Sequence, residues 1–222
     1  TMAECGFLTL ACDPSYPGES GGEPRNVASP DINTEDFSAA VDFLIAHPNV
    51  DAKRIGIIGI CGFGGMGLNA AAMDTRIKAT VASTMYDMSR VNANGYFDAE
   101  DSAEVRHNKR EAMNAIRTRD AQNGTATPGT PGLPTSIKGD EPQFVKDYFD
   151  YYKTERAFHA RAINSNGAWN PTMALSFINM PLLTYIHEID NAVLLIHGEN
   201  AHSRYFSEDA FKRLKGNNKD LL

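Results

Sequence analysis

Short, almost continuous apolar runs recur along the chain and are separated by longer amphipathic segments. Runs of this length, rich in β-branched and aliphatic residues, are typical of strands that are buried on both faces. We expect such strands at residues 6–12, 55–60, 78–84 and 191–197, and the start of one more at 218–222. Because helical segments separate the runs, the pattern predicts an α/β fold with βαβ units and a mostly parallel sheet.

The amphipathic segments between these runs predict helices. Asn33 or Thr34 is expected to cap a helix that continues to about Ala46. Phe37 and Val41 lie one helical turn apart and would share the buried face of this helix. Further helices are expected after the glycine-rich segment, over residues 102–119 and 144–152, and around residues 206–214.

The regular alternation of predicted strands and helices stops between residues 86 and 180. This block contains a charged helical segment, a loop rich in Thr, Pro and Gly at 122–139, and an aromatic segment. We interpret residues 86–180 as a helical lid over the carboxyl edge of the sheet, where open α/β sheets bind ligands. Residues 1–85 and 181–222 would then form the core. This core looks incomplete at both ends, so we expect a fragment of a longer chain.

Composition and charge exclude several classes of partner. A net charge of −7 without a Lys- or Arg-rich block argues against nucleic acid. No apolar run approaches the roughly 20 residues that span a bilayer, so no membrane partner is expected. The three cysteines show no regular spacing, which favours a reducing, cytoplasmic compartment. The histidines lack metal-ligand spacing, and we expect neither a metal nor a cofactor.

Cys61 is the strongest candidate for chemistry. It follows the predicted strand at 55–60 directly and precedes Gly62 and a helical segment. A nucleophilic side chain at a sharp strand-to-helix turn is a nucleophile elbow, which needs small neighbours because the turn is strained. The free N–H groups and positive dipole end of the helix should lower the pKa of this thiol. Cys5 and Cys12 are interpreted as inert.

With this elbow, the chain resembles the α/β-hydrolase superfamily, and in particular its dienelactone-hydrolase-like branch with its bacterial members. The resemblance is carried by Leu10–Gly22, Ile55–Gly62 and Val193–Glu199. It implies acyl chemistry on a small ester, lactone or thioester, with Cys61 as nucleophile. Gly62 would donate one N–H to the oxyanion. A small molecule is the expected partner, and exposed sheet edges would also favour a homo-oligomer.

The resemblance also implies an acid and a base, and here the chain departs from the family pattern. Phe63 stands where the elbow motif usually has glycine. Asp87, just after the run at 78–84, is one candidate acid and Glu199 is another, and the absence of any functional acid stays open. The family histidine would lie beyond Leu222, so the chain as given would lack it. His202 is the candidate substitute base.

The sequence also suggests substrate-contacting residues and two alternative functions. The residues expected to contact substrate are Phe63, Tyr86, Asp13 and Tyr16. Phe63 and the missing acid near residues 199–202 would also suit a non-catalytic relative that acts as a binding or interaction module. A second alternative is nucleotide binding, since Gly62–Gly67 matches the glycine spacing of a dinucleotide fingerprint. His197 is interpreted as a structural residue at a strand end.

Overall fold

The computed structural model describes residues 2–222, which divide into two compact units. Unit 1 comprises the chain up to Cys12 together with Ser29–Asp101 and Phe177–Leu222. Unit 2 comprises Asp13–Ala28 and Ser102–Ser176. The sequence interpretation assigned residues 86–180 to a lid, whereas residues 86–101 belong to unit 1. The role of unit 2 as a lid stays a prediction.

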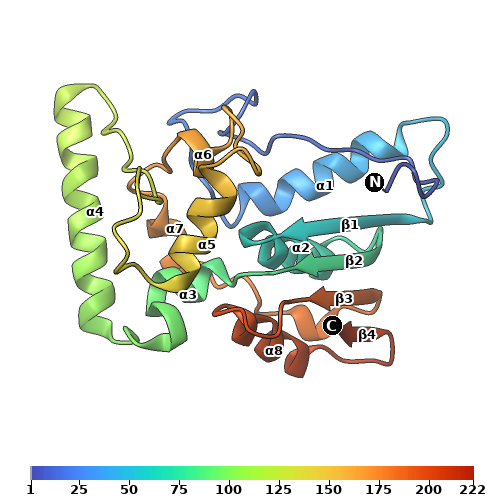
Figure 1. Ribbon diagram of the computed structural model, residues 1–222. Helices are drawn as coiled ribbons and strands as arrows, with labels where there is room; N and C mark the ends of the chain where they lie inside the picture. The colour runs from blue at the N-terminus through green and yellow to red at the C-terminus, as the bar shows by residue number, and fades with distance from the viewer. Residues whose placement is uncertain (1) are drawn as a thin grey trace. The chain divides into compact units, whose positions relative to one another are not determined.

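Unit 1 contains a parallel sheet in the order β1-β2-β3-β4 (Figure 1). Its strands among the described residues are β1 (Ile55–Ile60), β2 (Ile77–Ser83), β3 (Ala192–Ile196) and β4 (Lys219–Leu221). Ile60 lies opposite Ser83, which in turn lies opposite Ile196. The carboxyl ends of β1, β2 and β3 therefore meet at one edge, where open α/β sheets place their sites. The predicted fold class is confirmed.

Helices cover one face of this sheet. The helical elements of unit 1 are α1 (Ile32–Ile45), α2 (Gly62–Met73), α3 (Met88–Asn94), α8 (Arg204–Arg213) and the 3-10 turns η1 (Tyr96–Asp98) and η2 (Ile186–Glu188). Helix α2 packs against β1 and β2, and α1 packs against α2. Leu68 of α2 and Leu195 of β3 are completely buried on this side. The helices predicted near residues 33–46, after Cys61 and around 206–214, and the strands predicted at 55–60, 78–84 and 191–197, are confirmed to within a few residues.

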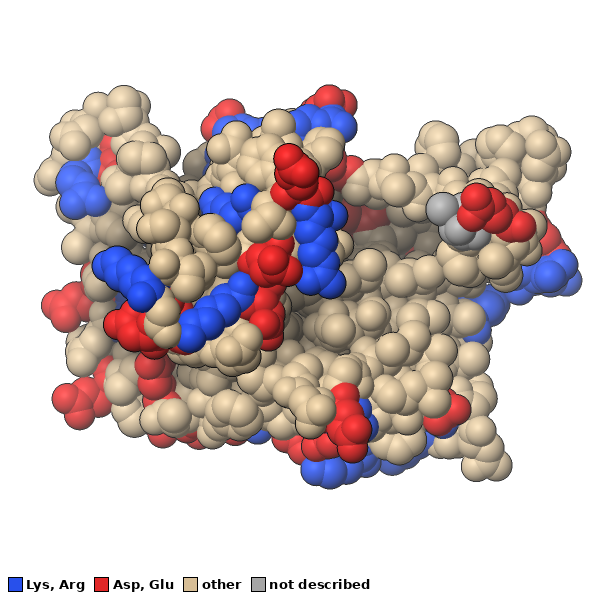
Figure 2. Space-filling model, in the orientation of Figure 1, with Lys and Arg blue, Asp and Glu red and all other residues tan. Residues whose placement is uncertain are grey.

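The opposite face of the sheet is apolar and exposed. Side chains alternate along a strand, so Ile57 faces α2 while Ile58 and Ile60 face the other way. Ile58 and Ile60 are 49% and 61% exposed, and Ile196 on β3 is 39% exposed. Figure 2 shows few charged side chains over this part of the sheet. An apolar surface of this kind is unusual because parallel sheets are normally covered on both faces.

Two local predictions were wrong. Residues 6–12 form no strand, and Phe7 and Leu8 are exposed. A strand forms only where a neighbour satisfies its backbone groups, and this segment pairs with no strand in the described chain. The cap of α1 is Asp31, because Asn33 and Thr34 already lie in the first helical turn, where both are buried.

Unit 2 is built mainly from helices and loops. Its helices are α4 (Ala103–Asn123), α5 (Gln143–Tyr152) and α6 (Ile163–Asn166), and α7 (Ala174–Asn179) follows in the chain. Ser102 begins α4 by accepting the Val105 N–H at 3.1 Å, and Gly124 ends it with φ 68°. The helices predicted at 102–119 and 144–152 are confirmed. None of the helices in residues 2–222 is long and apolar enough to cross a membrane.

Candidate active site

Cys61 lies in a tight turn between β1 and α2. Its φ of 58° and ψ of −127° fall in a region that non-glycine residues rarely adopt. Its N–H donates to the Ser83 carbonyl at 3.0 Å, and its carbonyl accepts the N–H groups of Gly64 at 2.9 Å and Tyr86 at 3.0 Å. The turn is therefore fixed to the helix that follows and to the neighbouring strand. This is the sharp strand-to-helix geometry that the sequence predicted.

Close backbone packing explains the glycines around this turn. A Cβ atom at Gly59 would lie 2.3 Å from the Phe63 carbonyl oxygen, and one at Gly65 would lie 2.3 Å from the Tyr86 carbonyl oxygen. Real Cβ atoms do not approach backbone so closely, so these positions require glycine. The glycine spacing that also matches a dinucleotide fingerprint thus has a packing explanation.

Cys61 is exposed to solvent, and the pKa of its thiol is raised. The residue is exposed, so a ligand can reach it. Protein atoms around the sulfur nevertheless displace water, and this burial raises the pKa of the thiol more than the Gly62 N–H lowers it. The predicted lowering of the pKa was therefore wrong, because desolvation outweighs the helix N-terminus. At neutral pH the resting thiol is protonated and needs a base to become nucleophilic.

Tyr86 and His202 meet at the same edge of the sheet as Cys61. Tyr86 Oη and His202 Nε2 are 2.7 Å apart, and the Tyr86 N–H is bonded to the Cys61 carbonyl. The Tyr86 ring is buried and lies 5.3 Å from the Phe206 ring, measured between centroids. Burial lowers the pKa of His202, so its imidazole is neutral near pH 7. A neutral imidazole is the form that accepts a proton.

The two candidate acids differ in their surroundings. Asp87 precedes α3, and its Oδ1 accepts the Arg90 N–H at 3.0 Å as a helix cap. Burial raises the pKa of this carboxyl, against the opposing effects of the Arg90 N–H and charge. Glu199 is exposed in the turn after β3. The contacts of Asp87 favour a structural role, and a catalytic acid at either position stays a prediction.

His197 is a structural residue, as the sequence indicated. It is buried at the end of β3, with Nδ1 2.7 Å from Ser207 Oγ and Nε2 3.0 Å from Ser203 Oγ. Both ring nitrogens are therefore engaged by serine hydroxyls at the start of α8. Its carbonyl also accepts a hydrogen bond from Arg204 at 2.6 Å. These contacts join β3 to α8 and position the intervening loop that carries His202.

The remaining sequence candidates have structural contacts. Phe63 packs toward α1, with its ring centroid 6.4 Å from that of Phe37. Asp13 and Tyr16 belong to unit 2, where they shape their own loop. Asp13 accepts the Glu19 N–H at 2.8 Å, and Tyr16 adopts φ 83°. The contribution of these three residues to substrate binding stays a prediction.

Sequence reasoning missed a cluster around η1 that contacts His202. The Tyr96 ring lies 5.3 Å from the His202 ring, and Arg90 forms ion pairs with Asp98 and Asp209. The only local indication of this cluster in the sequence is the segment Gly95–Asp98, whose composition is typical of a turn. The ion pair between Arg90 and Asp209 depends on α8, which lies more than 100 residues further along the chain.

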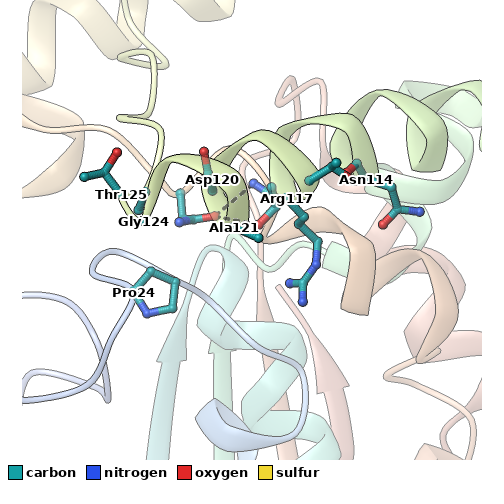
Figure 3. A pocket seen from close by; sticks show the side chains of 11 residues that line it. Pro24, Asn114, Arg117, Asp120, Ala121, Gly124 and Thr125 are labelled. Carbon is teal, nitrogen blue, oxygen red and sulfur yellow. Dashed lines mark hydrogen bonds between the residues drawn. The ribbon is translucent and has the colours of Figure 1, made fainter.

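Sequence reasoning also missed a cavity in unit 2. It measures about 670 Å³ and runs along α4, where Asn114, Arg117 and Thr118 contribute polar walls (Figure 3). Pro24 and Asn170 line the cavity from two loops of the same unit. No residue nominated from the sequence lines it.

Comparisons with known proteins identify the family. A model of the BAAT / acyl-CoA thioester hydrolase C-terminal family matches residues 32–127, which include the elbow. The uncharacterized protein PA2218 of Pseudomonas aeruginosa is 60% identical over 212 residues, which cover 95% of this chain and 56% of that protein. The uncharacterized protein YcjY of Escherichia coli is 32% identical over 226 residues, which cover 98% of this chain and 70% of that protein.

Solved structures agree with this assignment. The crystal structure of PA2218 superposes with a TM-score of 0.93 at 58% identity and covers 100% of this chain and 68% of the other. The α/β hydrolase GrgF from a Penicillium species shares the fold, with a TM-score of 0.71 at 20% identity over 94% of this chain and 68% of the other. The chain belongs to the family of YcjY, and it has the α/β-hydrolase fold. The chain spans little more than half the length of PA2218, and its place in a dienelactone-hydrolase-like branch stays a prediction.

Proposed function

We propose that this α/β hydrolase cleaves a small ester, lactone or thioester through Cys61. The observation that carries the proposal is the accessible thiol on a strained strand-to-helix turn, at the edge where the carboxyl ends of the parallel strands meet. A thioester is favoured among the three substrates because the family model that includes the elbow describes acyl-CoA thioester hydrolases. The dienelactone-like branch of the sequence interpretation would instead favour a lactone.

The first half of the reaction transfers the acyl group to sulfur. His202 accepts the Cys61 proton, and the thiolate attacks the carbonyl carbon to form a tetrahedral intermediate. The Gly62 N–H has no helical acceptor because it opens α2, so it is suited to stabilise the oxyanion. Collapse of the intermediate breaks the bond to the leaving alcohol or thiol, which takes the proton from His202. Acyl-Cys61 remains.

The second half regenerates the enzyme. His202 removes a proton from water, and hydroxide adds to the acyl carbon. Collapse of this intermediate releases the carboxylic acid and expels the Cys61 thiolate, which takes the proton back from His202. Tyr86 supports this role by holding His202 at 2.7 Å. In the tautomer in which Nε2 donates to Tyr86 Oη, Nδ1 is the acceptor nitrogen. A lowered His202 pKa keeps this base neutral until the pH falls below about 6.5, so the rate should fall only below that pH.

Turnover by Cys61 variants tests the proposal. We expect the chain to hydrolyse p-nitrophenyl acetate or a short acyl thioester, and Cys61→Ala to lose at least about 100-fold in kcat/KM. Cys5→Ser is the matched control, because Cys5 is also an exposed thiol of unit 1 and should leave the rate unchanged. Equal turnover by wild type and Cys61→Ala would remove Cys61 from the mechanism.

A binding module without catalysis is the second candidate. Two observations favour it: the raised pKa of the Cys61 thiol, and the Asp87 carboxyl that caps a helix. Under this alternative, acyl compounds would bind near Cys61 with saturable affinity and remain intact. Retention of the intact ester in equilibrium dialysis would support it, and release of the carboxylic acid would exclude it.

A further inference from the structure

The turn η1 has a strained backbone. Phe97 and Asp98 both have φ 56°, in the left-handed region that residues with a side chain rarely adopt. Gly95, which precedes the turn, has φ 73°. Two successive left-handed residues with side chains persist only where the surrounding structure determines them. The contacts of this turn should therefore explain why it adopts this conformation.

Arg90 supplies most of these contacts. Its Nε donates to Asp98 Oδ1 at 2.9 Å and Oδ2 at 3.2 Å, and a second guanidinium nitrogen also donates to Asp98. The third nitrogen donates to Asp209 of α8 at 2.9 Å. The guanidinium also lies over the Tyr205 ring, 5.2 Å from its centroid. The Tyr205 hydroxyl accepts the Phe97 N–H at 3.0 Å, so the turn is held from both sides.

The turn held in this way presents Tyr96 to the candidate base. The Tyr96 ring lies 5.3 Å from the His202 ring and 6.2 Å from the Tyr86 ring, both edge to face. Tyr86 bonds to His202 on another side. The contacts of His202 with groups from the β2 loop and from η1 thus cover part of its ring, which is half-buried. Other titratable groups of this loop region are His197, Glu199 and Arg204.

We propose that Arg90 is a positioning residue, which acts through Asp98 and Tyr96 to hold His202 in a shielded site. Its catalytic consequence rests on the proposed function, in which His202 is the base. Its structural consequence does not, because Arg90 holds Asp98, and Tyr96 of the same turn contacts His202, whatever the protein catalyses. Lys in place of Arg90 could not contact both carboxylates in the same way, because it lacks the planar fork of nitrogens.

The protonation of His202 in full-chain variants tests the proposal. The pKa would be read from the NMR titration of its ring protons, assigned with His202→Gln. We expect Asp98→Asn and Arg90→Lys to raise this pKa toward the ordinary value, as water reaches the ring. In an active protein, the acid limb of kcat/KM would move upward by the same amount. A merely structural role would lower stability without shifting either value.

Two further variants keep the test decisive. Tyr96→Ala leaves the ion pairs in place and should raise the pKa of His202 as well, even if an Arg90 variant fails to fold. Asp150→Asn breaks the exposed pair with Arg156 in unit 2 and should leave the pKa of His202 unchanged. An unchanged His202 pKa in folded Asp98→Asn and Tyr96→Ala overturns the proposal. Absence of turnover with a shifted pKa would instead overturn the proposed function alone.

Discussion

At the scale of the residue, Cys61 has an exposed position and a protonated thiol, so that it needs a neighbouring base in order to act as a nucleophile. Its backbone conformation and exposure suit a nucleophile, while the raised pKa of its thiol keeps it protonated. A cysteine of this kind depends on a base at the moment of reaction and not on a resting thiolate. In the proposed mechanism this base is His202, whose imidazole burial keeps neutral and whose Nε2 lies 2.7 Å from Tyr86 Oη.

Asp74 gives a prediction on stability at the same scale. It ends α2, and the Arg76 side chain, with which it forms hydrogen bonds at 2.9 and 2.7 Å, lowers its pKa to about 2. A depressed carboxyl pKa stabilises the fold above the unfolded pKa of about 4, and this contribution is lost as the pH falls toward about 2. Asp74→Asn should therefore lower the free energy of unfolding at pH 7 by about 1 to 2 kcal/mol.

Urea unfolding at several pH values measures this effect. The difference between wild type and Asp74→Asn should narrow as the pH falls from 4 toward 2. Asp150→Asn is the control, since its pair with Arg156 is exposed and should contribute less than about 0.5 kcal/mol. A difference that stays constant over this pH range would contradict the assigned ion pair.

The residue scale also marks the limit of sequence reasoning. The elbow at Cys61 was predictable because a strand, a turn and a helix follow one another locally. The pKa of its thiol was not, because desolvation depends on which segments pack around the sulfur. The contact between Tyr86 and His202 joins residues 116 positions apart and leaves no local signal.

At the scale of the element, α2 shows how the turn is built. Gly65 lies where a Cβ atom would meet the Tyr86 carbonyl oxygen at 2.3 Å, whereas the nearest atom to a Cβ at Gly67 is a Phe37 carbon at 3.6 Å. Both glycines belong to one helix and both lack a positive φ. The first therefore serves close packing against the loop after β2, while the second has room for a methyl group.

Alanine at these two glycines should have opposite effects. Gly65→Ala should destabilise the protein by about 1 to 3 kcal/mol, because backbone must move to admit the methyl group. Gly67→Ala should be neutral or stabilise by up to about 1 kcal/mol, because alanine favours the helix. Urea denaturation of both variants measures this, and equal effects would contradict the packing described for the elbow.

The strands also show that a local apolar pattern is not sufficient and that pairing with a neighbouring strand is needed. The runs at β1, β2 and β3 were predicted within a residue or two, because each pairs with a neighbour in the sheet. The run at 6–12 has similar composition, but it has no strand partner in the described chain and stays extended without a ladder. Apolar pattern indicates what a segment is able to form, and pairing decides whether it forms.

At the scale of the whole molecule, the exposed face of the sheet is the feature that most affects behaviour in solution. Ile58, Ile60 and Ile196 contribute to an apolar surface on unit 1. Exposed apolar patches of this kind mark surfaces that bind other molecules or promote association. The net charge of −7 opposes non-specific association but is carried elsewhere, because this face holds few charged side chains (Figure 2).

Binding of the apolar dye ANS should report this face. We expect ANS fluorescence to rise on addition of the protein, and Ile58→Thr with Ile60→Thr to reduce that rise several-fold while the melting temperature changes little. Ile77→Thr is the contrasting variant, because Ile77 is completely buried and its replacement should cost about 1 to 3 kcal/mol. ANS binding that the exposed substitutions leave unchanged would show that this face is covered in solution.

The most direct test of the account is mass spectrometry of the protein during turnover. An acyl donor such as p-nitrophenyl acetate or an acyl thioester would be mixed with the chain and quenched in acid, and the peptides mapped. The account predicts an added acyl mass on the peptide that contains Cys61, absent in Cys61→Ala and unaffected by Cys5→Ser. Product formation without acylation of Cys61, or acylation confined to Cys5 or Cys12, would contradict it.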